Sequence, residues 1–366
     1  MPPDPILQGL DSGDVTALAR AISLVENQRD GFERVLTHVH ERLGRAGARR
    51  IGITGPPGAG KSTLTEQLIR AFRGQGLKVA VVAVDPTSPF SGGALLGDRI
   101  RMETASTDPG VFIRSMATRG SIGGLATTTE EVCDVLDAFG FERIRIETVG
   151  VGQTELDVAR TAETTVLVLV PESGDGIQTL KAGVMEVADV YVINKADRPG
   201  AEQMQREIEI MLGIRKGNAY RHVGAHHGVD PKGLPDGRGR SGGRAVDRGP
   251  ERNRPPDRPT GGLGEWEPPV LRTVAPKGEG IPALLEALDR HRAFLEASGR
   301  LAARRRERLA ERTRAAVNRA VQQWVWEGSS AESILTQALD DMTAGTRSPY
   351  EVAAEILEQA RSGATR

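Results

Sequence analysis

Only one cysteine, Cys133, occurs among the 366 residues of the chain. A single cysteine cannot build a disulfide framework within one chain, and it cannot form a thiolate cage for a metal ion. Because Cys133 lies inside an apolar helical pattern, we expect it to pack in the core. No apolar run approaches the roughly 18 residues that a membrane-spanning helix needs. The first residues, MPPDPILQGL, lack the basic start and apolar run of a signal peptide, so we expect a cytoplasmic protein.

The chain also lacks an excess of either charge. Its 48 lysines and arginines nearly balance its 49 aspartates and glutamates, which leaves a net charge of −1. This balance gives no electrostatic signature of nucleic-acid or membrane binding, so we expect neither as a partner. The length suits one large α/β domain with an appendage, or two modest domains.

What the sequence does have is a glycine-rich loop between a strand pattern at residues 50–54 and a helical pattern at 63–72. The loop fits G-x-x-x-x-G-K-[ST], the phosphate-binding P-loop. Its backbone N–H groups and the helix N-terminus are expected to face the phosphates. Lys61 should reach the β- and γ-phosphates, and Ser62 should hold Mg²⁺. The predicted nucleotide contacts are Gly55, Pro56, Pro57, Gly58, Ala59, Gly60, Lys61, Ser62 and Thr63.

Acidic residues follow the next strand patterns, at the sheet edge where ligands bind in open α/β folds. Asp85 ends a β-branched run, and Asp98 lies in the glycine-rich loop beyond it. Both could hold Mg²⁺ directly or through water, although Asp98 could instead cap a helix. The strand pattern 143–149 carries Glu147, with Gly150 three residues on. We predict that Glu147 serves the Mg²⁺ shell and that the Gly150 N–H senses the γ-phosphate, as in the D-x-x-G motif of many GTPases.

A second signature, N-K-A-D, follows the strand pattern at residues 189–193. Asp197 can accept two hydrogen bonds from guanine, whereas adenine has neither donor. An unpaired buried charge costs on the order of 1–3 kcal/mol or more, so the site should prefer GTP to ATP. Asn194 is expected to tie this loop to the P-loop, and the Lys195 stem to lie along the base.

The predicted architecture is an α/β nucleotide-binding domain, built on a mostly parallel sheet, between two helical regions. Residues 215–264 are crowded with glycine, proline, arginine and aspartate, and they lack apolar periodicity. We interpret them as a disordered insert or as an error in the translated sequence. Val274 and Ala275 follow the last strand pattern, where a second base-contacting loop belongs. The expected divisions are a helical cap at 1–49, the nucleotide-binding domain at 50–297 and a C-terminal helical region at 298–366.

Apolar residues in the C-terminal third recur every seven positions: Leu288, Leu295, Ala302, Leu309 and Ala316. This spacing predicts a long helix with a narrow apolar seam. Many arginines lie between the seam positions, and we expect them to form a solvated face. The seam is expected to be a partner or dimer surface.

Taken together, the motifs resemble those of the MeaB/ArgK family of G-proteins, to which the methylmalonic aciduria type A protein belongs. The resemblance covers nearly the whole chain apart from residues 215–264. Beyond the P-loop and N-K-A-D, it rests on VDPTSPFSGGALLGDRIRM at 84–102, RSMATRGSIGGL at 114–125, ETVGVGQTE at 147–155 and SPYEVAAEIL at 348–357.

The resemblance implies an Mg²⁺-dependent GTPase of the SIMIBI class that forms a homodimer through its C-terminal helices. Around phosphate and metal it implies Lys61, Ser62, Asp85, Asp98 and Glu147. It further implies a chaperone of an adenosylcobalamin-dependent acyl-CoA mutase, chiefly methylmalonyl-CoA mutase, which gates cofactor loading and protects the mutase from inactivation. The mutase would accelerate slow GTP hydrolysis, and Lys181 matches a catalytic lysine of a switch segment. The chain departs from the family pattern in PESG at 171–174 and in Val274.

Two other functions remain open at this point. An old label in this family is kinase of periplasmic amino-acid-binding proteins, which would need a protein acceptor and a base near the γ-phosphate. A metal-insertion GTPase for nickel enzymes would share the fold and usually carries a cysteine and histidine cluster. Here the candidates for such a cluster are one cysteine and the histidines of the insert, His222, His226 and His227.

Overall fold

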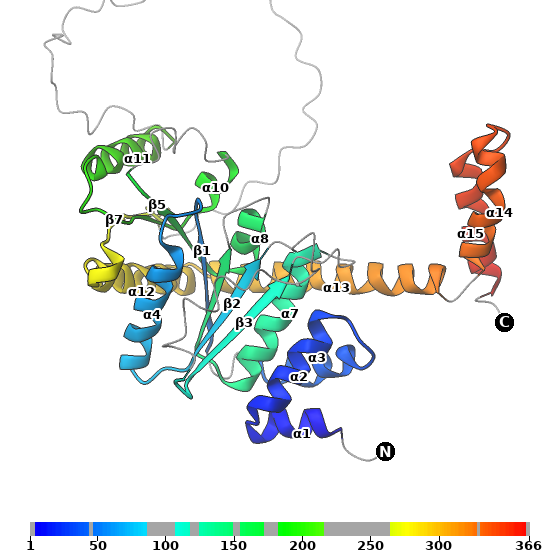
Figure 1. Cartoon of the computed structure of the whole chain (residues 1–366), viewed down its shortest axis with the longest axis horizontal. Coiled ribbons are helices and arrows are strands. Elements are labelled where there is room, and N and C mark those ends of the chain that lie inside the picture. The colour runs from blue at the N-terminus through cyan, green and yellow to red at the C-terminus, as the bar shows by residue number, and fades with distance from the viewer. Residues whose placement is uncertain are drawn as a thin grey trace, which may run out of the picture.

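The computed structural model describes residues 4–43, 47–85, 107–117, 124–148, 154–171, 182–215, 264–327 and 330–363. At its centre is a seven-stranded sheet in the order β3-β2-β4-β1-β5-β6-β7 (Figure 1). Every neighbouring pair of strands is parallel, which confirms the predicted type of sheet. The strands are β1 (Arg49–Thr54), β2 (Val79–Asp85), β3 (Val111–Ala117), β4 (Arg143–Thr148), β5 (Thr164–Leu169), β6 (Val190–Ile193) and β7 (Val270–Arg272).

Helices cover both faces of the sheet, because most of its inner strands are apolar on both faces. On one face, α4 (Lys61–Gly74) and α12 (Ile281–Ala297) pack against alternate residues of the strands, such as Val81 and Val168. The other face carries α7 (Gly124–Phe139), α8 (Thr154–Thr161), α10 (Ala182–Val187) and α11 (Ala201–Arg215).

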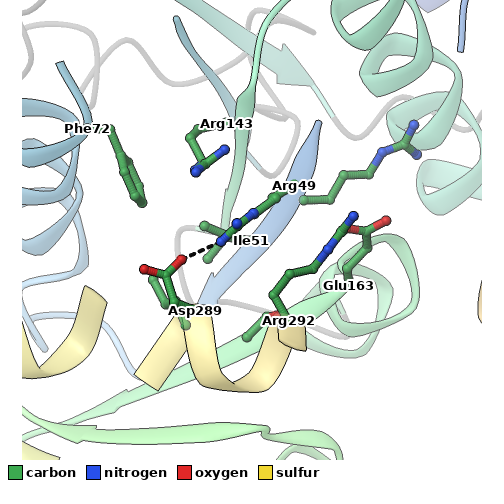
Figure 2. A pocket seen from close by; sticks show the side chains of 10 residues that line it. Arg49, Ile51, Phe72, Arg143, Glu163, Asp289 and Arg292 are labelled. Carbon is green, nitrogen blue, oxygen red and sulfur yellow. Dashed lines mark hydrogen bonds and ion pairs between the residues drawn. The ribbon is translucent and has the colours of Figure 1, made fainter. Parts of the chain in front are cut away.

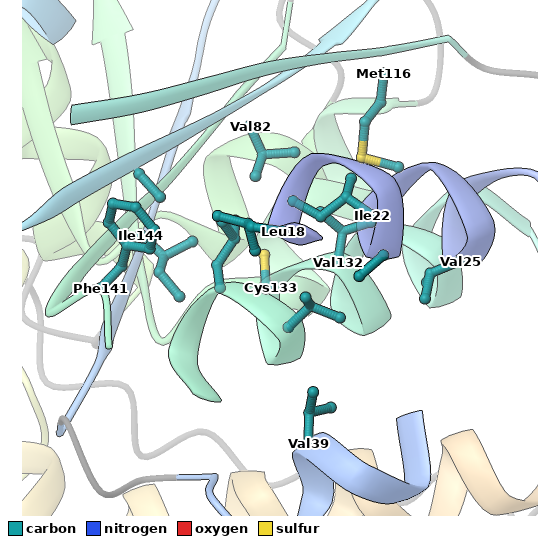
Figure 3. Close-up of a cluster of buried hydrophobic side chains, with 14 of the residues drawn as sticks. Leu18, Ile22, Val25, Val39, Val82, Met116, Val132, Cys133, Phe141 and Ile144 are labelled. Carbon is teal, nitrogen blue, oxygen red and sulfur yellow. The ribbon is translucent and has the colours of Figure 1, made fainter. Parts of the chain in front are cut away.

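The predicted N-terminal helical cap is confirmed as three helices, α1 (Pro5–Ser12), α2 (Val15–Glu26) and α3 (Phe32–His40). Figure 3 shows Leu18 and Ile22 of α2 packed on Val132 and Cys133 of α7. Cys133 is therefore a core residue, as predicted. Burial raises the pKa of its thiol to about 12, so it stays protonated and unreactive at neutral pH.

The C-terminal region continues from α12 through α13 (Arg300–Trp326) to α14 (Ala331–Thr343) and α15 (Pro349–Gly363). The expected continuous seam is wrong in its first part. The chain breaks between α12 and α13 at Gly299, whose φ of 70° is left-handed. Leu288 lies in the core of the sheet domain, and Leu295 is also fully buried within the chain.

Most arginines of α13 do not lie on the solvated face that the sequence predicts. Five of them point at the sheet domain, and we call this set the arginine row: Arg304, Arg305, Arg308, Arg312 and Arg319. Arg312 pairs with Asp134 of α7, and Arg319 pairs with Glu131 one turn away. Both carboxylates are buried. Removing Arg319 would take from Glu131 its hydrogen-bonded partner, which is costly for a buried charge, whereas Asp134 also pairs with Arg50. The row therefore fixes α13 to α7.

The arginine row also holds the end of α8. Arg308 donates to the Thr161 carbonyl at 2.7 Å, and Arg304 donates to the Glu163 carbonyl at 2.9 Å. Cations at a helix C-terminus are favourable because they face the last carbonyls and the negative end of the helix dipole. The Glu163 carboxylate accepts from Arg305 of α13 and from Arg292 of α12; Figure 2 shows Arg292 beside Glu163.

Glu130 of α7 lies in a cavity of about 310 Å³ under the arginine row. Burial raises the pKa of its carboxyl from 4.5 to about 7, and Asp134 adds to the rise. Three arginines that face it, Arg308, Arg50 and Arg312, oppose the rise. At a pH between 4.5, the ordinary pKa, and about 7, the pKa in the folded chain, Glu130 holds a proton that it loses on unfolding. The contribution of Glu130 to the free energy of unfolding therefore falls as the pH rises through this range.

We therefore expect Glu130→Gln to help stability more at pH 8 than at pH 5. Glutamine cannot ionise, so the variant escapes the loss that wild type suffers on deprotonation. The gap in the free energy of unfolding between variant and wild type should grow by up to about 3 kcal/mol over that range. Urea unfolding at both pH values measures it. An equal gap at pH 5 and pH 8 would show that Glu130 does not titrate as described.

Candidate nucleotide site

The P-loop connects β1 to α4 along the edge where the parallel strands end. Gly55 and Gly60 have φ of 142° and 84°, which favour glycine. A Cβ on Gly55 would lie 2.1 Å from the Val168 carbonyl oxygen, and one on Gly60 would lie 2.4 Å from Nδ2 of Asn194. No side chain caps the start of α4. The loop is therefore built from backbone, with amides of the first helical turn at its centre.

Lys61 is the cation within this loop, and only 6% of it is exposed. Its Nζ donates to the carbonyl oxygens of Gly55 at 2.9 Å and Pro56 at 3.1 Å. The ammonium thus spans the loop from the helix to its first residues. A positive charge held here can bind the phosphates of a nucleotide.

Glu147 and Ser62, which the sequence places 85 residues apart, meet in the structure. Ser62 Oγ donates to Glu147 Oε1 at 2.9 Å. Thr65 Oγ1 donates to Glu147 Oε2 at 2.7 Å, and the carboxylate is 2% exposed. A hydroxyl and a carboxylate are hard oxygen ligands of the kind that Mg²⁺ takes. The pair fits the predicted metal site beside the P-loop lysine.

The other predicted metal and phosphate residues are described only in part. The backbone of Asp85 ends β2, and β2 pairs with β4 through Ala83 and Glu147. That pairing brings Asp85 to the same edge as Glu147. The side chain of Asp85 lies outside the described residues, as do Asp98, Gly150 and Lys181 in full. Among residues that the structure does describe, no group of three or more histidine, cysteine or acidic side chains could hold a metal.

Asn194 joins three loops around the predicted base site. Its Nδ2 donates to the Ala59 carbonyl in the P-loop at 2.8 Å, which is the tie expected from the sequence. Its Oδ1 accepts from the Thr273 hydroxyl and from the Ala275 amide, both at 3.1 Å. Asn194 is 1% exposed, so these bonds are made in a dry setting where leaving one unmade is costly. The N-K-A-D loop is thereby fixed relative to the phosphate loop.

The rest of the base site is arranged around this anchor. Lys195 follows in the left-handed region with φ of 54°, and Asp197 is exposed. Val274 and Ala275 are both buried. Their side chains therefore face the protein interior, and any contact of theirs with a base would use the main chain. The turn is closed by a bridge between Val274 and Glu279.

Two residues near the site were missed from sequence. Thr65 lies one turn beyond Ser62 on α4, and Arg145 lies two residues before Glu147 on β4. Burial lowers the pKa of the Arg145 guanidinium to about 10, a fall that the Glu147 carboxylate opposes, so it remains charged at neutral pH. The signal in the sequence was the alternation RIRIE, which places two arginines and the glutamate on one face of a strand.

A P-loop that leaves a parallel strand, with an N-K-A-D loop tied to it by an asparagine, defines a P-loop GTPase. The chain belongs to the family described as methylmalonyl-CoA mutase-associated GTPase MeaB, whose family model matches residues 18–330. A protein of Pyrococcus abyssi is 42% identical over 360 residues, which cover 98% of this chain and 97% of that one.

The mitochondrial methylmalonic aciduria type A homolog of Mus musculus is 35% identical over 317 residues, covering 82% of this chain and 66% of that protein. Among solved structures, one titled LAO/AO transport system kinase superposes with a TM-score of 0.59. It has 25% identity and covers 96% of this chain and 95% of its own. The predicted P-loop fold and GTPase class are therefore confirmed. No helix in the described ranges has the length and apolar character to cross a membrane.

Proposed function

We propose that this GTPase is a chaperone for an adenosylcobalamin-dependent acyl-CoA mutase, with methylmalonyl-CoA mutase as the first candidate. It would gate loading of the cofactor and protect the mutase from inactivation. The observation that carries the proposal is the family match, which spans the nucleotide domain and reaches through α13. That family is described by its association with methylmalonyl-CoA mutase.

The chemistry proposed for the site is attack by water on the γ-phosphate of GTP. Lys61 and the P-loop amides would stabilise the charge that spreads over the phosphate oxygens. Ser62 and Glu147, with Asp85 and Asp98, would hold Mg²⁺, which supplies neutralising charge when bound. A further cation, from Lys181 or from the partner, would complete the site and could accelerate hydrolysis by about 10³- to 10⁵-fold.

Contacts of the arginine row support a link between the nucleotide and the C-terminal region. Helix α8 begins directly after residues 149–153, which include the predicted γ-phosphate sensor Gly150. Helix α8 packs closely on β1 at Gly52. A Cβ at that position would lie 2.6 Å from Cγ1 of Val158 on α8, which is too close for any residue but glycine. The far end of α8 is held by Arg308 and Arg304 of α13. A shift of α8 with nucleotide state would therefore reach α13 directly.

The test is GTP turnover with and without purified methylmalonyl-CoA mutase. We expect the mutase to increase turnover by at least about tenfold and the two proteins to co-purify. Lys61→Ala serves as the control, because it shows that the phosphate released comes from this protein. Unchanged turnover together with no co-purification would contradict the proposal.

A kinase function is the second candidate, because the superposed structure is titled a transport system kinase. Incubation with labelled GTP or ATP and a periplasmic amino-acid-binding protein would separate the two. Label transferred to the binding protein would favour the kinase. Release of free phosphate without transfer would favour the chaperone.

We also propose a homodimer formed through the C-terminal helices. A groove of about 610 Å³ runs between the end of α13 and α15, and it is lined by apolar residues including Val325 and Ile356. Val321, Trp326 and Leu357 border it with large exposed side chains. Apolar surface concentrated at one end of a chain marks an interaction site.

Val321→Glu is expected to convert the dimer to a monomer, because it places a charge in the proposed interface. Light scattering coupled to gel filtration gives the mass directly. Arg314→Glu, at an exposed position on the same helix, is the matched control and should stay dimeric. Monomeric wild type at micromolar concentration would contradict the proposal.

A further inference from the structure

A line of charged side chains runs along the face of β4 that packs against α4. Alternate residues of a strand share a face, so Arg143, Arg145 and Glu147 point the same way, whereas the isoleucines between them enter the opposite core. Arg143 lies over Phe72 of α4 and Arg145 bonds to Thr65. Glu147 accepts from both Ser62 and Thr65. The charged line therefore leads from the start of the strand to the proposed Mg²⁺ site.

Arg145, in the middle of this line, is fully buried. A charge in such a place is costly unless it is hydrogen-bonded and near an opposite charge. Its Nη1 donates to the Thr65 carbonyl at 2.5 Å, and its Nη2 donates to the Thr65 hydroxyl at 2.9 Å. Both bonds are made to Thr65, so the guanidinium contacts α4 through this one residue.

The bond from Arg145 decides where the proton of the Thr65 hydroxyl goes. A guanidinium only donates, and a hydroxyl has one proton. Thr65 Oγ1 must accept from Arg145, and its own proton points to Glu147 Oε2 at 2.7 Å. Five other helical threonines within the described residues instead donate to the carbonyl four residues back, the ordinary local bond; these are Thr37, Thr161, Thr313, Thr336 and Thr343.

We propose that Arg145 and Thr65 are positioning residues for Glu147. Thr65 holds one oxygen of the carboxylate, which leaves the other oxygen facing Ser62 and the Mg²⁺ site. Arg145 fixes the hydroxyl of Thr65 in this orientation and places a positive charge behind the carboxylate. The inference rests on the proposed role of Glu147 at the magnesium. Outer partners of a metal ligand commonly change metal affinity by about 10- to 100-fold.

The experiment measures how much Mg²⁺ is needed to tighten binding of a fluorescent GDP analogue. We expect Arg145→Met to raise the half-maximal Mg²⁺ concentration by about 10- to 100-fold. Affinity for the analogue in EDTA should stay at the wild-type value, because the P-loop is intact. Arg319→Met is the matched control: it also removes a buried arginine, but one held by Glu131 of α7. It should lower the melting temperature and leave the Mg²⁺ requirement unchanged.

Two variants of Thr65 test the same inference even if Arg145→Met does not fold. Thr65→Val removes the hydroxyl at almost constant volume and should raise the Mg²⁺ requirement as Arg145→Met does. Thr65→Ser retains the hydroxyl and should restore a requirement near that of wild type. The Mg²⁺ requirement of the Arg145→Met, Thr65→Val double variant should rise by less than the two single effects combined, because the residues share one contact.

Glu147→Gln separates failure of this inference from failure of the metal site. If Glu147→Gln shifts the Mg²⁺ requirement while folded Arg145→Met and Thr65→Val do not, the positioning role is overturned and the metal site stands. If Glu147→Gln leaves the requirement unchanged, the proposed metal role fails and the inference fails with it.

Discussion

Replacing Lys61 with alanine is expected to abolish the binding of GTP. The ammonium of Lys61 is buried in the P-loop within 3.1 Å of two loop carbonyls, where a triphosphate would bring several negative charges. Without the lysine, those charges would be desolvated with only Mg²⁺ and neutral amides to face them, and charge-assisted bonds are about twice as strong as neutral ones. Any residual turnover should be lower by at least about 10²- to 10³-fold.

Calorimetry with GTP and Mg²⁺ checks this result. Lys78→Ala is the matched control, because Lys78 is exposed next to the start of β2, the opposite end of that strand from Asp85. It should bind GTP as wild type does. Normal GTP binding by a folded Lys61→Ala variant would show that the phosphates bind elsewhere.

Asp197→Asn should change the base that the site accepts from guanine to xanthine. Aspartate accepts from both the ring N–H and the amino group of guanine. Xanthine carries a carbonyl in place of that amino group, so the amide of asparagine can donate to it. Hydrogen bonds to charged groups contribute about 1.5–3 kcal/mol, so GTP affinity should fall by about 10- to 100-fold.

Competition between GTP and xanthosine triphosphate measures the exchange of preference. The effect should appear in binding and leave the P-loop intact, since Asn194 still ties the two loops. Glu202→Gln on α11, an exposed acid that pairs with Arg272, is the control and should keep the preference for GTP. An unchanged preference in Asp197→Asn would place the base outside this loop.

Much of the fold could be predicted from the sequence, because local signals and tertiary structure agree there. The β-branched runs that precede Asp85 and Asn194 are buried on both faces, and they form parallel strands of the sheet. The P-loop and the N-K-A-D loop could be recognised because each needs particular residues at fixed spacing after a strand. The bond from Asn194 to Ala59 follows from bringing both strand ends to one edge.

What could not be predicted depends on pairs that are distant in the chain. Arg145 bonds to Thr65 across 80 residues. The alternation RIRIE indicates that Arg145 shares a strand face with Glu147, but it does not indicate which element that face meets. The sequence predicts a solvated face for the arginine row, because arginines on a helix are usually exposed. Its carboxylate partners, such as Asp134 and Glu163, lie more than a hundred residues earlier in the chain. The seven-residue spacing predicts a continuous apolar seam for a partner, and this is wrong at Leu288 and Leu295, because both are buried within their own chain.

The most direct test of a pocket built for guanosine triphosphate is a titration of the wild-type protein with GTP and with ATP, each with Mg²⁺. GTP should bind at least about tenfold more tightly, because Asp197 can pair with guanine and is left unpaired by adenine. Preference for ATP, or no binding of either nucleotide by folded protein, would contradict the assignment.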